Sequence, residues 1–359
     1  TSKSQSGSDM PLIAVDAMGG DTVPSVPVKG AFRALQENSD LQVVLVGPED
    51  QVIPEIESCG GLSDRMQFVH APQWVTMDES PVEALRGKPE SSLNAIVNMQ
   101  KERSVQGIFS AGNTGAFVAA CSIHLRLLEG IRRPAIALPM PRGESPVILC
   151  DGGANVESRP LHLLHNAVMS ATFLKSVYGV ESPRVGLLNV GSERDKGHTL
   201  AKETYSLLSD SGLNFQGNVE GNDLYNTSLD VIVCDGFTGN VILKSSEGLA
   251  SFIFSTIARE LTRESSSGID LGPFKEMIAA GLQRIASHFD YAEYGGAPLL
   301  GPRGVCTIGH GKSDEKAVCN AIGWTLKMIE SGIEEDLVQS VAEVTSRIES
   351  CNPDSEQQV

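Results

Sequence analysis

Five short apolar runs in this chain each end in a polar, glycine-rich turn: IAVDAMGGD (residues 13–21), IFSAGNTG (108–115), VILCDGGAN (147–155), LLNVGS (187–192) and VIVCDGFTGN (231–240). Each run has the length and composition of a buried parallel strand. In open α/β sheets, ligands bind at the edge formed by the carboxyl ends of the strands. The five turns therefore predict a single polar, anion-binding edge on a mostly parallel sheet.

Length and composition limit the possible architectures. The chain has 359 residues, of which 41% are hydrophobic and 20% charged, enough to bury the core of one large α/β domain or of two lobes. Residues 1–9 are rich in Ser and poor in apolar side chains, so we expect a flexible N-terminal extension there. No apolar run reaches the ~20 residues of a membrane-spanning helix. Because no signal-peptide pattern is visible either, we expect neither membrane spanning nor secretion.

Cysteine usage and charge narrow the functional classes. The seven cysteines include no CxxC pair, which is typical of reduced thiols in a cytoplasmic protein and not of a disulfide framework or a zinc site. The net charge of −17 opposes nucleic-acid binding, because a phosphate backbone requires a basic surface. An anionic ligand must therefore be held by a local group of N–H donors with Lys or Arg side chains.

Predicted strands and helices alternate as far as residue 235, which indicates a three-layer α/β/α fold with helices on both faces of a mostly parallel sheet. We interpret residues 10–350 as a single α/β/α domain and residues 351–359 as a frayed tail. Strands are predicted at residues 12–16, 42–47, 67–69, 108–110, 135–139, 147–151, 185–190, 215–219 and 231–234. Helices are predicted at residues 26–37, 92–100, 114–128, 161–178, 200–208, 314–329 and 334–348.

Residues 241–289 differ from this pattern, since they predict two long helices joined by the polar loop 265–268, a protruding helical hairpin. The apolar stripe of the first helix includes Leu249, Phe252 and Ile253. We expect this stripe to face the core or a dimer partner instead of lipid, because the polar faces of the hairpin mix acidic and basic residues.

The first turn combines two glycines with the start of a helix. Gly19 and Gly20 let the backbone approach an oxyanion, and the helix that follows adds N–H donors and a favourable dipole. Asp16 and Asp21 flank these glycines. An ordinary tight turn in which Asp21 caps the helix fits the same residues equally well.

The second and third turns repeat this chemistry. Asn113 offers both a donor and an acceptor, and Thr114 is the predicted cap of the next helix. Asp151 and Asn155 occupy the third turn. Turn formation explains any one of these motifs, but it does not explain their convergence, so all four residues are candidates for substrate binding.

The fourth turn continues as ERDKGH (193–198), with three basic side chains within five residues. In so acidic a protein this concentration predicts a phosphate or carboxylate ligand at the end of a strand. We interpret Arg194 as a solvated side chain and Lys196 as functional.

The fifth turn leads directly into the predicted hairpin. Asp235 ends the strand, and Thr238 and Asn240 are candidate caps of the long helix. Asn240 is equally suited to donate its amide N–H to a developing oxyanion.

Several familiar motifs are absent from the sequence. There is no GxSxG elbow, and Gly311-Lys312-Ser313 lacks the earlier glycine of a P-loop. Gly309-x-Gly311 lacks the third glycine of a dinucleotide fingerprint. His162 and His165 share a helical face without a carboxylate in register, so we expect no metal site.

Taken in chain order, the motifs resemble one known family. IAVDAMGGD, SAGNTGA, DGGANVE, SPRVGLLNVG, GNVEGNDL, DGFTGNVILKSSEG, YGGAPLLG and GHGKSDEKA are similar to those of the PlsX-type acyl-acyl-carrier-protein:phosphate acyltransferases, over residues 12–329. The resemblance implies a fold similar to the isocitrate/isopropylmalate dehydrogenase and phosphotransacetylase group, used without a nicotinamide cofactor.

The resemblance also implies an activity. Family members are homodimers that make acyl phosphate from an acyl carrier protein thioester and inorganic phosphate. The product passes to a membrane acyltransferase that acylates glycerol 3-phosphate in phospholipid synthesis. The resemblance implies a cytoplasmic protein that associates peripherally with the inner face of the membrane. It also implies a reaction that needs no cofactor and no metal.

Roles for the candidate residues follow from this chemistry. We expect Lys196 to bind phosphate or neutralise the tetrahedral intermediate, and Asn240 to donate to its oxyanion. The first, second and third turns are expected to build the remaining walls of the site, with His310 and Lys312 as further contributors. We also expect an apolar groove for the acyl chain and a basic patch for the carrier protein. The candidates are Phe252, Ile253, Met277 and Ile278 for the groove, and Arg86, Lys88, Arg132 and Arg133 for the patch.

Rival functions remain open. A phosphotransacetylase-like enzyme would use short acyl-CoA in preference to carrier-bound long chains. A catalytically silent scaffold that recruits phospholipid enzymes to the membrane is disfavoured by the intact polar edge. An NAD-linked dehydrogenase is disfavoured by the failed fingerprints.

Overall fold

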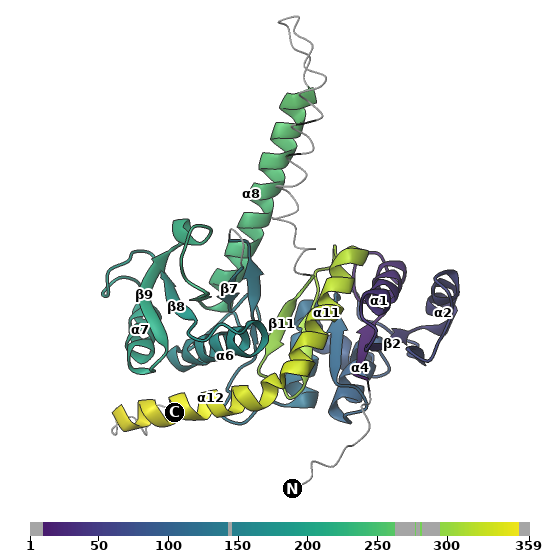
Figure 1. Cartoon of the computed structure of the whole chain (residues 1–359), viewed down its shortest axis with the longest axis horizontal. Coiled ribbons are helices and arrows are strands. Elements are labelled where there is room, and N and C mark those ends of the chain that lie inside the picture. Colours follow the sequence, from purple (N-terminus) through teal and green to yellow (C-terminus); the bar gives the residue numbers. More distant parts are fainter. Residues whose placement is uncertain (1–9, 143–145, 263–276, 278–280, 282–294, 352–359) are drawn as a thin grey trace, which may run out of the picture.

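The computed structural model describes residues 10–142, 146–262, 277, 281 and 295–351. It contains two lobes side by side, each built on one sheet (Figure 1). The first sheet has the order β3-β2-β1-β4-β12-β11-β5, with β1 Leu12–Asp16, β2 Gln42–Gly47, β3 Met66–His70, β4 Gly107–Ser110, β5 Ala135–Ile136, β11 Ala297–Leu300 and β12 Val305–Ile308. The second has the order β6-β7-β10-β8-β9, with β6 Leu138–Met140, β7 Val147–Cys150, β8 Arg184–Asn189, β9 Asn214–Glu220 and β10 Val231–Val233.

The helices lie between these strands as a mostly parallel sheet requires. Their bounds are α1 Ser25–Glu37, α2 Glu49–Ser58, α3 Pro81–Gly87, α4 Ser92–Lys101, α5 Thr114–Ala120, α6 Pro160–Tyr178, α7 Thr199–Asp210, α8 Gly236–Thr262, α11 Glu315–Ser331 and α12 Ile333–Cys351. The predicted helix at 114–128 is shorter, because α5 gives way to a π-helical turn, Cys121–Leu125. α2 and α3 are two helices that the sequence pattern did not predict.

The α/β class with mostly parallel strands is confirmed, but the strands form two sheets where one was predicted. The predicted strand at 135–139 divides at Ala137: β5 pairs with β11 in the first sheet, and β6 pairs with β7 in the second. These pairs and β11–β12 are antiparallel, and the remaining pairs are parallel. β11 and β12 were not predicted from the sequence, because each has only four residues and lies between glycine-rich turns.

Helices cover both faces of the first sheet, whereas α6 and α12 cover one face of the second, and the side chains of each strand alternate between the two faces of its sheet. Ile13 of β1 packs in one apolar cluster with residues of α1 and α11, while the next residue, Ala14, packs in another with residues of α4. In the second lobe, Ile148 of β7 packs with residues of α6 and α12, while Leu149 belongs to the cluster that contains Ala14. This shared cluster joins the two lobes through a common core.

α8 rises from the junction of the lobes and projects far beyond them (Figure 1). It begins at Gly236, five residues before the predicted start, because the turn after β10 itself caps the helix. The second arm of the predicted hairpin lies outside the described residues except for Met277 and Gly281. The predicted N-terminal extension and C-terminal tail also lie outside the described residues, except for Cys351, which ends α12.

One helix is longer and more apolar than the short apolar runs of the sequence indicated. Within α8, Gly236–Glu260 has a mean hydropathy of 1.3 over its most apolar window of 18 residues, and none of that window is buried inside the protein. Lys244 and Glu247 interrupt the apolar sequence of α8, so its uninterrupted apolar runs are short. By length and composition alone, this helix of the described part of the chain meets the requirement for a membrane span.

Candidate functional site

The turns after β1, β4 and β12 meet at the carboxyl edge of the first sheet. A Cβ atom on Gly19 would lie 2.8 Å from Ser110 Oγ and 2.9 Å from the backbone nitrogen of Gly112, so only glycine lets these two turns touch. The backbone N–H of Asp21 donates to the carbonyl of Gly311 at 2.7 Å. Three turns that are far apart in the sequence therefore form one surface.

Asp16 links the turns after β1 and β4 through hydrogen bonds of its buried carboxylate. Its carboxylate is buried and accepts hydrogen bonds from Ser110 Oγ at 2.8 Å and from the Met18 backbone N–H at 3.1 Å. Burial raises the pKa of Asp16. Of the four candidates in the first turn, Asp16 thus faces the protein interior, whereas Gly20 is half-buried and Asp21 is exposed at the surface.

Asn113, and not Thr114, caps α5. Its Oδ1 accepts from the Ala116 N–H at 3.0 Å, and its Nδ2 donates to the carbonyl of Glu79 at 3.0 Å. The prediction that Thr114 caps the helix is wrong, because Asn113 has the extended backbone of a cap and Thr114 is the first helical residue, with an exposed side chain. Asn113 therefore ties the second turn to the segment before α3.

The turn after β7 is built around a buried carboxylate. Asp151 Oδ1 accepts backbone N–H bonds from Ile136, Gly153 and Ala154 at 2.9 to 3.1 Å, and Oδ2 accepts from the backbone and side-chain nitrogens of Asn155 at 2.8 and 2.9 Å. Burial raises the pKa of Asp151 in spite of these donors. Asn155 also donates to the carbonyl of Pro134 at 2.6 Å. Both side chains organise the turn from within.

The turn after β10 presents Asn240 on the first turn of α8. Asp235 is the cap, since its Oδ1 accepts the Thr238 N–H at 2.9 Å and its Oδ2 accepts the Thr238 hydroxyl at 2.7 Å. The prediction that Thr238 and Asn240 cap this helix is therefore wrong. The Asn240 side chain is exposed and lies against the turn after β7, with Cγ 3.5 Å from the position of a Cβ on Gly153.

Lys196 lies on the turn after β8, the strand next to β10, so it shares an edge with Asn240. Its Nζ is 3.8 Å from Glu193 Oε1, and its carbonyl accepts from the Asn189 side chain at 3.1 Å. The Lys196 side chain is 51% exposed, and its salt bridge is within its own turn. No contact between Lys196 and Asn240 occurs among those described for this part of the chain.

A polar cluster that the sequence analysis missed joins the two lobes. Lys244 and Glu247 of α8 form a salt bridge at 3.0 Å, and Lys244 Nζ lies 3.2 Å from Nε2 of His310, which follows β12 in the other lobe. Glu247 Oε1 is 3.9 Å from the same nitrogen. The signal was present in the sequence: Lys244 is four residues after Asn240, so the two share a helical face.

The hydrogen bonds of His310 fix its tautomer. Its Nδ1 accepts the backbone N–H of Lys312 at 3.2 Å, so a neutral ring carries its proton on Nε2. The Nε2–H group and the Lys244 ammonium are then two donors 3.2 Å apart. Such a pair is suited to share one acceptor, such as an oxygen of a phosphate.

Burial, and after it the Lys244 ammonium, lowers the pKa of His310, while Glu247 acts in the opposite direction. The neutral ring is thus favoured in the folded protein, and the resulting stability is lost as the pH falls from ~6.5 toward the folded-state pKa. We expect Lys244→Ala to raise the pKa of His310 and Glu247→Gln to lower it further. An NMR titration of the ring protons measures both shifts, and shifts of the same sign in the two variants would contradict the arrangement.

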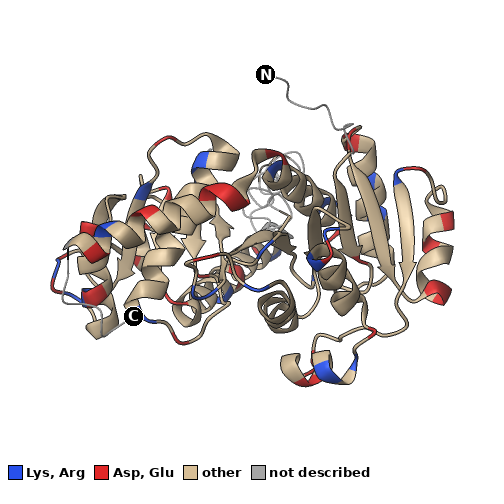
Figure 2. Cartoon of the chain, turned by 90° about the horizontal axis from the view of Figure 1, so that it is seen from below, with Lys and Arg blue, Asp and Glu red and all other residues tan. Residues whose placement is uncertain are grey.

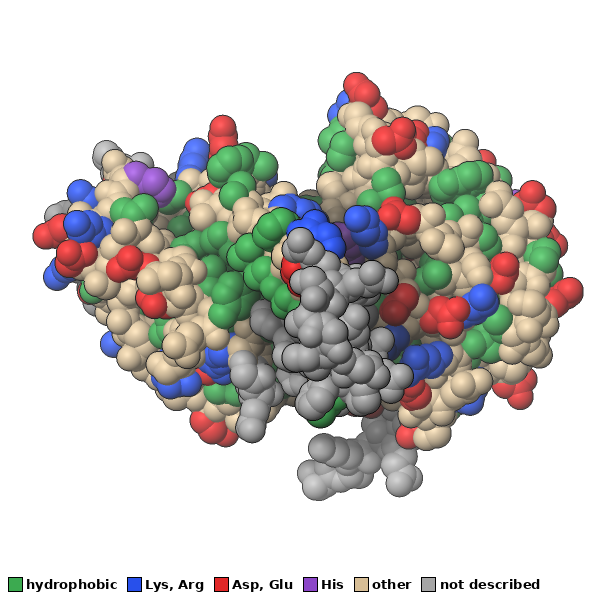
Figure 3. Space-filling view, turned by 90° about the horizontal axis from the view of Figure 1, so that it is seen from above, with side chains coloured by type: hydrophobic (Ala, Val, Ile, Leu, Met, Phe, Trp, Pro, Cys, Tyr) green, Lys and Arg blue, Asp and Glu red, His purple; other side chains and the backbone are tan. Residues whose placement is uncertain are grey.

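Seen from above, the surface is hollowed between the two lobes, and Lys, Arg and His side chains gather near the centre of the molecule (Figure 3). Asp and Glu are spread over the helices of both lobes, with Lys and Arg among them (Figure 2). The basic groups at the cleft therefore stand out against a net charge of −17. The described residues contain no group of three or more His, Cys, Asp or Glu side chains that could hold a metal ion.

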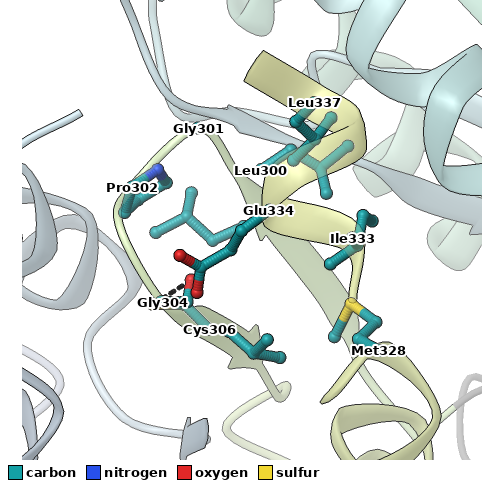
Figure 4. A pocket seen from close by; sticks show the side chains of 11 residues that line it. Leu300, Gly301, Pro302, Gly304, Cys306, Met328, Ile333, Glu334 and Leu337 are labelled. Atoms are coloured by element: carbon teal, nitrogen blue, oxygen red, sulfur yellow. Dashed lines mark hydrogen bonds between the residues drawn. The ribbon is translucent and has the colours of Figure 1, made fainter. Parts of the chain in front are cut away.

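A separate cavity lies at the opposite edge of the first sheet, behind the turn between β11 and β12 (Figure 4). Apolar residues of β11, α11 and α12 line it together with Glu334, whose carboxylate accepts the Gly304 N–H. Burial raises the pKa of Glu334. The space open to a water-sized molecule is about 10 Å³, enough for about one water molecule, so this cavity does not accommodate a metabolite.

The chain is similar to known proteins over most of its length. A family model described as "Fatty acid synthesis protein" matches residues 12–336. The chain is 42% identical over 339 residues to a phosphate acyltransferase of Desulfitobacterium hafniense, covering 93% of this chain and 98% of that one.

Solved structures show the same fold at low sequence identity. A phosphotransacetylase from Streptococcus pyogenes has a TM-score of 0.56 at 15% identity, covering 89% of this chain and 94% of that one. A putative 4-hydroxythreonine-4-phosphate dehydrogenase from Salmonella typhimurium has a TM-score of 0.50 at 12% identity, covering 89% of this chain and 99% of that one. The predicted relation to phosphotransacetylases and dehydrogenases is confirmed at the level of fold.

Proposed function

The chain belongs to the phosphate acyltransferase family, and we propose that it transfers a fatty acyl group from acyl carrier protein to inorganic phosphate, giving acyl phosphate for phospholipid synthesis. Acyl transfer to phosphate follows from the family. The carrier-bound donor and the role in phospholipid synthesis are the proposed parts.

The reaction requires positioning more than proton transfer. A phosphate oxygen attacks the thioester carbonyl carbon, a C–O bond forms, and the tetrahedral intermediate collapses as the C–S bond breaks and thiolate leaves. Phosphate is already an anionic nucleophile, and a thiol of pKa ~8.5 is a tolerable leaving group. Holding phosphate beside the carbonyl and stabilising the developing oxyanion are the main tasks of the protein.

The observation that carries the proposal is the contact of Lys244 with His310 across the two lobes. It brings the glycine turns of the first sheet and the start of α8 to one cleft. We assign phosphate binding to the Lys244 and His310 donors with the backbone of the Gly19–Gly20 turn. Lys312 supports His310 through its backbone N–H.

On the other side of the cleft, we assign the oxyanion donor to Asn240 and a charge-neutralising role to Lys196. Six candidates have side chains that bond within the protein and support the turns of the two sheets. They are Asp16 and Asn113 in the first sheet, and Asp151, Asn155, Asp235 and Thr238 in the second. Asp21, Gly20 and Thr114 remain candidates for contacts with substrate at the surface.

Incubation with palmitoyl carrier protein and phosphate tests the proposal. We expect release of the carrier thiol that depends on phosphate, with an equal amount of acyl phosphate trapped by hydroxylamine. Thiol release without phosphate would instead indicate a thioesterase. Turnover of acetyl-CoA or butyryl-CoA that is faster than turnover of palmitoyl carrier protein would favour the phosphotransacetylase-like alternative. That alternative is considered because a phosphotransacetylase has a similar fold.

The proposal includes a homodimer, a cytoplasmic location and peripheral contact with the membrane that holds the glycerol-3-phosphate acyltransferase. α8 supports it, because Leu249, Phe252 and Ile253 are exposed along a helix whose apolar span is not buried within the chain. An exposed apolar stripe marks an interaction surface.

The contact with the acidic carrier protein is proposed at the start of α6. Arg132, Arg133 and Arg159 are exposed and close enough to His162 that, after burial, their charges lower its pKa. Lys88 is a weaker candidate, because its ammonium is 2.7 Å from Glu79 and its charge is neutralised there.

A further inference from the structure

Four large apolar side chains are exposed at the carboxyl edge of the second sheet. Val156 follows β7, Val190 follows β8, and Phe237 and Val241 follow β10, with exposed fractions of 68%, 81%, 60% and 49%. We call these four residues the apolar edge.

The four residues lie on neighbouring elements. β10 is hydrogen-bonded to β7 on one side and β8 on the other, and adjacent strands are about 4.8 Å apart. The Gly236 N–H donates to the carbonyl of Asn155 at 2.9 Å, which brings Val156 beside Phe237. Leu187 pairs with Val233, so Val190 and Phe237 lie three and four residues beyond the same register position.

The apolar edge is continuous with the candidate site. Phe237 and Val241 are one helical turn apart on α8, and Asn240 lies between them in sequence and on the same side of the helix. One turn further, Lys244 reaches His310 across the cleft. In Figure 3, hydrophobic side chains gather on this lobe next to the basic side chains near the centre of the molecule.

We infer that the apolar edge binds the aliphatic chain of the acyl donor. The inference rests on the proposed function. If Asn240 receives the carbonyl oxygen of the thioester, the first methylenes of the chain must lie within a few ångströms of it, where Phe237 and Val241 are. Covering these exposed side chains with methylene groups removes apolar surface of both from water.

The apolar edge is far from the acyl-chain groove that was predicted on the helical hairpin. Phe252 is twelve residues along α8 from Asn240, which corresponds to about 18 Å of helix. A chain that begins at Asn240 therefore meets the apolar edge before it reaches Phe252.

The test compares chain lengths in variants that carry no new charge. Val190→Asn and Val156→Asn change exposed turn residues, and kcat/KM is measured with palmitoyl and butyryl carrier protein. We expect the palmitoyl-to-butyryl ratio to fall about tenfold or more in each variant, because only the long donor gains from apolar cover. Leu62→Asn is the matched control: Leu62 is 55% exposed but precedes β3, at the opposite edge of the first sheet, and this variant should keep the parental ratio.

Other outcomes overturn the inference. An unchanged ratio in both variants removes the acyl chain from this edge. An equal loss with both donors assigns the edge to the pantetheine arm or the carrier itself, and a changed oligomeric mass assigns it to a second copy of the chain.

A parent protein that forms acyl phosphate from neither donor would refute the proposed function separately. In that case the edge is tested by titration with cis-parinaric acid, a fluorescent fatty acid. Weaker binding to Val190→Asn than to Leu62→Asn supports the acyl site, and equal binding refutes it.

Discussion

Asn240→Ala is expected to lower turnover about 100- to 1,000-fold, the usual cost of losing one oxyanion donor. The Asn240 side chain is exposed on the first turn of α8 and no hydrogen bond of its amide occurs within the described residues. Its loss should therefore change the free energy of unfolding by no more than ~0.5 kcal/mol. Steady-state kinetics with palmitoyl carrier protein and a thermal melt measure the two effects.

Lys196→Ala is the companion variant, and Lys202→Ala, at an exposed position on the adjacent helix α7, is its control. If Lys196→Ala and Asn240→Ala both fold and keep turnover within a few fold of the parent, the roles assigned to these two residues are wrong. If only Asn240→Ala loses turnover, Lys196 has no role in the reaction, and phosphate binding is assigned to Lys244 and His310 without it.

Gly239→Ala is expected to abolish most activity by displacing the residue beside it. A Cβ at this position would lie 1.9 Å from the carbonyl oxygen of Asp151 and 3.2 Å from Cys234 Sγ. Overpacking of this kind costs ~1 to 3 kcal/mol or more, and the first turn of α8 must move away from the turn after β7. Because this movement carries Asn240 out of place, we expect at least the ~100-fold loss predicted for Asn240→Ala, together with a lower melting temperature.

The same helix provides the control for this substitution. Gly248 is exposed on α8, and a Cβ there would meet no atom within 4 Å. Gly248→Ala should stabilise the helix by up to ~1 kcal/mol and leave turnover unchanged. Parental turnover and melting temperature in Gly239→Ala would show that the close contact with Asp151 does not position the site.

Hydrophobic patterning predicted most of the strands because their residues alone carry the signal. The bounds of β1 and β2 agree with the prediction to the residue, since each is a run of buried apolar side chains ended by glycine or aspartate. The local sequence did not identify the cap of α5, because Asn113 and Thr114 are both suitable cap residues. Only the backbone conformation of the folded turn selects Asn113.

The division into two sheets had no local signal. Residues 135–139 form one apolar segment, and only pairing with β11 on one side of Ala137 and β7 on the other separates β5 from β6. The cluster of Lys244, Glu247 and His310 is equally non-local, since 66 residues separate Lys244 from His310.

The sequence by itself determined the α/β class, the polar turns at the carboxyl ends of the strands and the family, because each of these depends on residues close together in the chain. The tertiary structure decided which of those polar groups face inward and which face the cleft. Asp151 and Asn240 looked alike as members of glycine-rich turns, yet burial gives the first to five N–H donors and leaves the second exposed. That distinction depends on which turns pack together, and packing is a property of the whole fold.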